Sequence, residues 1–101
     1  MHYITYILYS NILNRYYTGS TVLELNERLD RHLRDYYGLT KFTHKAKDWT
    51  IYYVIECESL PQSRKIEAHI KRMKSKKYIE NLKQHPDIAM RLLQKYRETQ
   101  D

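Results

Sequence analysis

The chain opens with a run of mostly apolar and aromatic positions, and with a second such segment shortly after it this run predicts a β-hairpin. Residues 2–10 and 16–20 are rich in β-branched and aromatic side chains, which is typical of strands. The stretch 11–14 between them, which begins and ends with Asn, is expected to form the turn. Because side chains alternate along a strand, Tyr6 and Tyr9 are expected to point to opposite faces of the sheet.

The apolar period then changes from two residues to about four. Residues 22–36 carry leucines at helical spacing and predict a helix, with Ser20 or Thr21 as its cap and Gly38 just beyond its end. The lysine-rich stretch 39–48 predicts a polar loop.

The second half of the chain predicts one more strand and a series of helices. Residues 49–57 form a nearly continuous apolar run, which favours a central position in the sheet. Ser59 has the spacing of a capping box, with a proline in the first turn, and predicts a helix to about Ser75 that buries Ile66, Ile70 and Met73. A short helix over 78–84 follows, and Pro86 can open a last one whose apolar stripe is Ile88, Leu92 and Tyr96.

The element order is therefore strand, strand, helix, strand, helix and short C-terminal helices. This order predicts the α+β class, with a small three-stranded antiparallel or mixed sheet covered by helices. We expect residues 1–84 to form one domain and residues 85–101 to form a C-terminal helical extension.

Composition narrows the range of functions. The 101 residues fit one domain, and 18 Lys and Arg against 12 Asp and Glu give a net charge of +6, which favours a polyanionic partner. Nucleic acid is the first candidate and an anionic membrane surface the second. The chain shows neither an apolar run of about 18 residues nor a leader, so we expect no membrane span, no signal peptide and a cytoplasmic location. Cys57 is the only cysteine, which excludes an intramolecular disulfide and a cysteine zinc cluster.

Positive charge is concentrated in residues 64–77, which hold seven Lys and Arg and a single acid. Such a cluster can contact phosphates and give affinity without base specificity. A solvated helix face is the alternative for any one of these lysines. The candidates for nucleic-acid binding are Lys71, Arg72, Lys74, Lys76 and Lys77.

Two tyrosine-bearing segments, 3–10 and 15–21, precede an Arg and a His four residues apart. This arrangement resembles the GIY-YIG nuclease family, whose signature is two short strands each carrying a tyrosine, followed by a helix that presents Arg and His to the same cleft. Of the six signature letters, Tyr6, Tyr17 and Gly19 stand unchanged. The resemblance extends from about Tyr3 to Leu82 and implies the same α+β fold.

The resemblance also implies catalytic roles for the two tyrosines. Tyr6 and Tyr17 would face the cleft, where one phenol can act as general base if a metal and cationic neighbours lower its pKa. The alternative is a cross-strand aromatic pair with a structural role. Gly19 would let the backbone pass close to a substrate or adopt a conformation that other residues resist.

Arg28 and His32 are four residues apart and are expected on one helix face. By resemblance, Arg28 contacts the scissile phosphate and His32 assists proton transfer or orients the water. The interval before Arg28 is about one residue longer than in the family, so Arg31 is the alternative. The alternative to both roles is a solvated helix face with an ion pair between Glu24 and Arg28.

Glu67 matches the family glutamate that holds one divalent metal, with Mg²⁺ as the expected ion and waters in its other positions. The alternative is an ordinary pair with Lys71 one helical turn away. Asn81 matches a polar residue late in the family that supports the site.

The function implied by the resemblance is a metal-dependent endonuclease that hydrolyses DNA phosphodiester bonds. Two alternatives remain on the same fold: a catalytically silent nucleic-acid-binding module, and a protein-interaction domain whose basic face meets an acidic partner.

Overall fold

The computed structural model describes residues 1–37 and 48–97, with three strands in one antiparallel sheet. The strands are β1 (His2–Ser10), β2 (Arg15–Leu23) and β3 (Thr50–Cys57), and β1 lies between the other two. The helices are α1 (Leu29–Tyr37), α3 (Leu60–Met73), α4 (Lys76–Gln84) and α5 (Pro86–Lys95). The α+β class and the predicted order of elements are confirmed.

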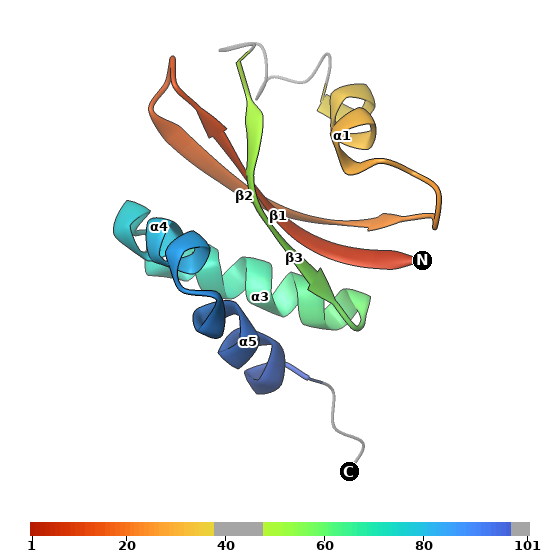
Figure 1. Cartoon of the computed structure of the whole chain (residues 1–101), viewed down its shortest axis with the longest axis vertical. Helices are drawn as coiled ribbons and strands as arrows, with labels where there is room; N and C mark the ends of the chain where they lie inside the picture. Colours follow the sequence, from red (N-terminus) through yellow and green to blue (C-terminus); the bar gives the residue numbers. More distant parts are fainter. Residues whose placement is uncertain (38–47, 98–101) are drawn as a thin grey trace.

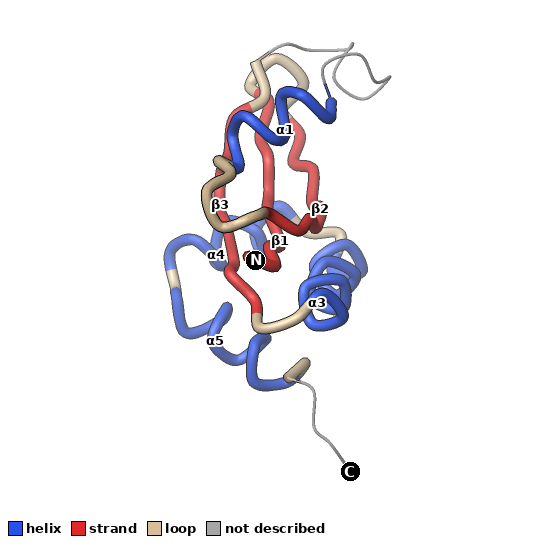
Figure 2. The backbone as a smooth tube through the Cα atoms, turned by 90° about the vertical axis from the view of Figure 1, so that its right-hand side faces the viewer, coloured by secondary structure: helices blue, strands red, loops and turns tan. Residues whose placement is uncertain are grey.

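The two faces of the sheet pack against different helices. One hydrophobic cluster joins Ile7 and Ile55 of the sheet to residues of α3, α4 and α5, including Ile66 and Leu82. A second cluster on the other face joins Ile4, Tyr6, Leu8 and Leu23 to Leu33 of α1. Figure 1 shows α1 apart from the other helices, and in the turned view of Figure 2 α1 lies at the upper end with α3, α4 and α5 below it. The expected alternation of β1 is confirmed, because neighbouring residues enter different clusters.

The β1–β2 turn is held by a residue that lies two positions before the start of β3. The Ser10 hydroxyl donates to one carboxylate oxygen of Asp48 at 2.6 Å, and the Ile12 N–H donates to the other at 2.9 Å. These two donors, the hydroxyl first, hold the pKa of the Asp48 carboxyl below its usual value. Asn14 closes the turn with φ 50°, a conformation that Asn tolerates better than most residues.

Helix α3 begins as its sequence predicts. The Ser59 side chain accepts the N–H of Gln62, and Pro61 occupies the first turn. Ile66 and Ile70 are buried, and the Thr5 hydroxyl donates to the Ser63 carbonyl at 2.7 Å, which fixes the helix on the sheet. The predicted burial of Met73 is wrong: its side chain is 45% exposed because α3 ends there.

The predicted start of the first helix is also wrong. Strand β2 continues through Leu23, and α1 begins only at Leu29, so the residues expected to cap a helix lie within the strand. Val22 pairs with Tyr3, and Leu23 is buried in the second cluster, whereas Leu25 is 74% exposed. The leucines of residues 22–36 are therefore divided among the end of β2, a turn and α1, and do not belong to one continuous helix.

The central position predicted for residues 49–57 is wrong as well. β3 is an edge strand, and Ile51 and Val54 are 38% and 37% exposed. Its apolar character comes from one buried face and from aromatic residues that are only partly buried. Strand β1, which is buried over most of its length, takes the centre.

Helices α4 and α5 occur where they are predicted, with α4 starting two residues earlier. Ala89 and Leu92 of α5 enter the first hydrophobic cluster, and Ile88 and Tyr96 pack against it. The division of the chain after residue 84 stays a prediction. Within the described ranges, no helix is long and apolar enough to cross a membrane.

Candidate active site

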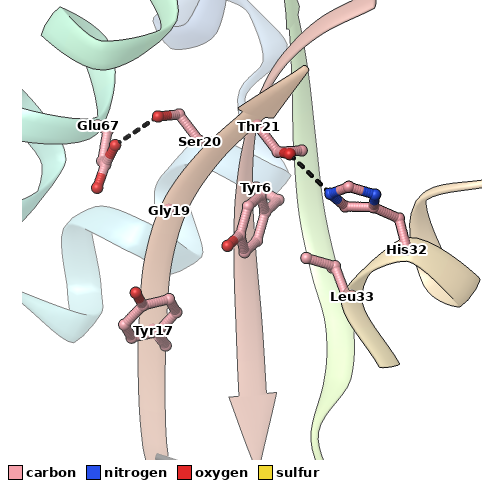
Figure 3. Close-up of a pocket in the computed structure, with 8 residues that line it drawn as sticks. All are labelled: Tyr6, Tyr17, Gly19, Ser20, Thr21, His32, Leu33 and Glu67. Carbon is pink, nitrogen blue, oxygen red and sulfur yellow. Dashed lines mark hydrogen bonds between the residues drawn. The ribbon is translucent and has the colours of Figure 1, made fainter. Parts of the chain in front are cut away.

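A cavity of about 240 Å³ opens beside the edge strand β2. Its lining comes from β1, β2, α1 and α3, as Figure 3 shows. The eight residues are Tyr6, Tyr17, Gly19, Ser20, Thr21, His32, Leu33 and Glu67. Five of the site residues predicted from the sequence thus meet in one place, although they lie up to 61 positions apart.

The two signature tyrosines lie next to each other across the β1–β2 pair. Their ring centroids are 6.5 Å apart and the rings are tilted by 42°. Tyr6 is only 2% exposed, whereas Tyr17 is partly exposed. Both line the cavity, so the aromatic pair and the cleft-facing placement occur together.

Gly19 is needed because the Tyr6 ring lies over it. The two residues are direct partners in the β1–β2 register, and a Cβ on Gly19 would lie 2.5 Å from the Tyr6 hydroxyl oxygen and 2.6 Å from Cζ. The backbone of Gly19 does not adopt a positive φ. The glycine therefore makes room for the phenol rather than for an unusual backbone conformation.

His32 is held between a strand and the turn that precedes its helix. Its Nε2 lies 3.0 Å from the Thr21 hydroxyl, and its Nδ1 lies 3.3 Å from a carboxylate oxygen of Glu27. The other oxygen of Glu27 accepts the N–H of Glu24 at 2.8 Å. This hydrogen bond, followed by the contact with His32, lowers the pKa of the Glu27 carboxyl. A carboxylate beside one ring nitrogen fixes the orientation of the imidazole.

Sequence reasoning did not assign Glu27, Thr21 or Ser20 to the site. Glu27 and Thr21 contact His32 only because β2 ends at Leu23 and the chain turns before α1. The sequence signal that could have indicated Ser20 and Thr21 is the alternation of side chains along β2, which places these two residues on opposite faces of the strand.

Glu67 reaches the cavity from α3 on the other side of β2 (Figure 3). One of its carboxylate oxygens accepts the Ser20 hydroxyl at 2.7 Å, and the other accepts the Lys71 ammonium at 2.7 Å. The ion pair that was the alternative interpretation is therefore present, and it coexists with a place in the cavity wall.

The oxygen atoms of Glu67 and Ser20 suit a hard divalent cation. Mg²⁺ keeps several waters and needs only one or two carboxylates from a protein. Among the described residues, no three His, Cys, Asp or Glu side chains gather in a way that could hold a metal. A metal in this cavity would accordingly be held by one carboxylate, with the neighbouring hydroxyl and water.

The two arginines lie outside this cavity. Arg28 precedes α1, its side chain is 77% exposed, and its Nε lies 3.3 Å from Asp30 rather than near Glu24. Arg28 and Arg31 line a neighbouring cavity of about 310 Å³ whose wall also includes His32. His32 thus separates the two cavities, and the roles predicted for the arginines stay predictions.

The remaining predicted residues are divided between two regions. Lys71, Lys74 and Lys76 line a groove that also touches Tyr17. Arg72 lies elsewhere, with its guanidinium 3.3 Å from the hydroxyl of Tyr96. Two others line none of the described cavities: the exposed Lys77, and Asn81, whose carbonyl accepts the N–H of His85 at the end of α4.

Comparison with known proteins identifies a family. No curated protein and no solved structure matches the chain. The family model described as the GIY-YIG catalytic domain matches residues 2–80, which run from β1 to within α4. This range contains both signature tyrosines, the glycine beneath Tyr6, and the histidine and glutamate of the cavity. Since the match covers most of the 101 residues, the chain belongs to the GIY-YIG nuclease family.

Proposed function

We propose that this protein is a metal-dependent endonuclease that hydrolyses DNA phosphodiester bonds in one step. The observation that carries the proposal is the meeting of Tyr6, Tyr17, His32 and Glu67 at one cavity. These side chains come from β1, β2, α1 and α3. An aromatic pair with only a structural role would need neither the histidine nor the carboxylate beside it.

In the proposed reaction, a water oxygen attacks the phosphorus and the ester bond to the leaving oxygen breaks. The water loses a proton, and the leaving oxygen gains one. Tyr6 or His32 accepts the proton from the water, because both reach the cavity with an atom that can exchange protons. Glu27 and Thr21 keep the His32 ring in place during this transfer.

Negative charge develops on the phosphate during the attack, and positive charge must meet it. A divalent metal held by Glu67, when bound, supplies such charge and polarises the phosphate oxygens. Arg28 or Arg31 is proposed to add a permanent positive charge from the outer side of His32. The cytoplasmic location expected from the sequence stays part of the proposal.

A nicking assay on supercoiled plasmid, with and without Mg²⁺, tests the proposal. Wild-type protein should nick the plasmid only with the metal, and Glu67→Gln should abolish nicking while DNA binding is kept or strengthened, since a negative charge near the phosphates is lost. Glu80→Gln is the matched control, because it removes the same charge from a partly exposed helical residue outside the cavity.

The same measurements separate the alternatives. A silent nucleic-acid-binding module would bind DNA in a salt-dependent way without nicking it. A protein-interaction domain would do neither. Equal nicking by Glu67→Gln and wild type would disprove the role of Glu67.

A further inference from the structure

A second cavity, of about 380 Å³, adjoins the candidate active site. It runs between β2 and the junction of α3 and α4. Tyr17 lines both cavities. Lys71 lines the second one and also reaches Glu67 of the first, with its ammonium 5.6 Å from the centre of the Tyr17 ring. We call this second cavity the basic groove; its lining is Arg15, Tyr16, Tyr17, Thr18, Ile70, Lys71, Lys74, Ser75, Lys76 and Ile79.

The groove combines positive charge with apolar surface. Arg15, Lys71, Lys74 and Lys76 supply four cations, and no acidic residue lies among the described lining. Within the part of the chain that the structure describes, neither Arg15 nor Lys74 has an acidic partner at ion-pair distance. Both side chains are exposed and available to phosphates.

The apolar part of the groove includes two isoleucines and two tyrosines. The ring of Tyr16 is fixed by its neighbours, with centroids 4.8 Å from Tyr9 and 4.9 Å from Tyr52. A rigid aromatic ring among cations is the combination that binds single-stranded nucleic acid, because the cations follow the backbone and the ring stacks on a base. A paired duplex offers phosphates to such a groove but keeps its base faces stacked inside.

From this combination we infer that the basic groove binds an unpaired segment of DNA and leads it into the active site. The inference rests on the proposed nuclease function and defines its substrate: DNA with unpaired nucleotides next to the scissile bond. The phosphates are bound by Arg15, Lys74 and Lys76, and a base stacks on Tyr16. Lys71 lies between the groove and the active site, where its ammonium contacts Glu67. Arg72 and Lys77, which lie outside the groove, add at most general attraction to DNA.

Binding in the presence of EDTA tests this inference without cleavage. Fluorescence anisotropy would compare a labelled blunt duplex with the same duplex carrying an unpaired tail of about ten nucleotides. Wild-type protein should bind the tailed duplex about tenfold more tightly. The double variant Arg15→Gln/Lys74→Gln should lose most of this preference, whereas Arg72→Gln/Lys77→Gln, which removes the same charge outside the groove, should keep it.

The readout is the ratio of the two affinities, because a general loss of charge weakens both complexes alike. Circular dichroism of each variant establishes that it is folded before binding is measured. Equal binding of both DNAs by the wild type, or equal loss of preference in both double variants, would overturn the inference. Tail preference without plasmid nicking would instead support the groove and refute the proposed catalysis.

Discussion

The contact between Tyr6 and Gly19 gives a prediction whose size can be worked from the structure. In Gly19→Ala, the added methyl group would lie 2.6 Å from Cζ of Tyr6, and an ordinary contact begins at 3.4 Å. The ring must therefore retreat by about 0.8 Å, within a cluster that leaves it only 2% exposed. Overpacking of this kind costs about 1–3 kcal/mol. Alanine also lowers the conformational entropy of the unfolded chain relative to glycine, and this effect offsets about 0.4–1 kcal/mol of the loss in stability.

We therefore expect Gly19→Ala to lower the free energy of unfolding by about 1–2 kcal/mol. Urea denaturation followed by circular dichroism measures this value. The same substitution is then made in a Tyr6→Leu background, where Cζ and the hydroxyl are missing. There it should be neutral or slightly stabilising, so that the double-mutant cycle assigns the cost to this one contact. An equal loss in both backgrounds would show that Gly19 serves some other purpose.

Two further predictions concern the phenols and one carboxylate. Tyr6→Phe and Tyr17→Phe should each slow plasmid nicking by about 100-fold or more, while the free energy of unfolding changes by only about 1 kcal/mol. Tyr53→Phe is the control, because Tyr53 lies outside the cavity. Nicking at the wild-type rate by the first two variants would show that these tyrosines have only a structural role. Asp48 has a lowered pKa in the folded protein, so it stabilises the fold above its ordinary value of 3.8 and less as the pH falls through its folded pKa. Wild type should exceed Asp48→Asn in free energy of unfolding at pH 7, and this difference should shrink below about pH 4; a constant difference would contradict the linkage.

The sequence was sufficient for those elements whose signals are local. The capping serine and the proline at the start of α3 locate that helix almost to the residue, and the β-branched run of residues 2–10 locates β1. The end of β2 was not predictable in the same way, because leucines at helical spacing occur in a segment that long-range pairing draws into the sheet. Edge and central strands were confused for a similar reason, since burial of β1 depends on both neighbours at once.

The residues of the candidate site also differ in whether local sequence or long-range contacts reveal them. A tyrosine pair and a glycine can be recognised by resemblance, because these signature letters stand unchanged, and the glutamate is the single acid among residues 64–77. The residues that hold these side chains in place cannot be recognised in this way. The hydroxyl of Ser20 contacts Glu67 across 47 positions, and Glu27 contacts His32 only because of a turn that the leucine spacing did not predict. The placement of Arg28 outside the cavity has the same origin, since α1 begins after it rather than before it.

The position of the site at the edge of the sheet follows from the alternation of β2. Ser20 and Thr21 are consecutive residues, so their side chains point to opposite faces. One hydroxyl contacts Glu67 from α3, and the other contacts His32 from α1 (Figure 3). A central strand would have a neighbour along both edges, whereas in the described part of the chain no strand pairs with the outer edge of β2, and groups from both faces meet there at one cavity. A shift of β2 by one residue would exchange the two hydroxyls and break both contacts, so the register in which Gly19 pairs with Tyr6 also determines the geometry of the site.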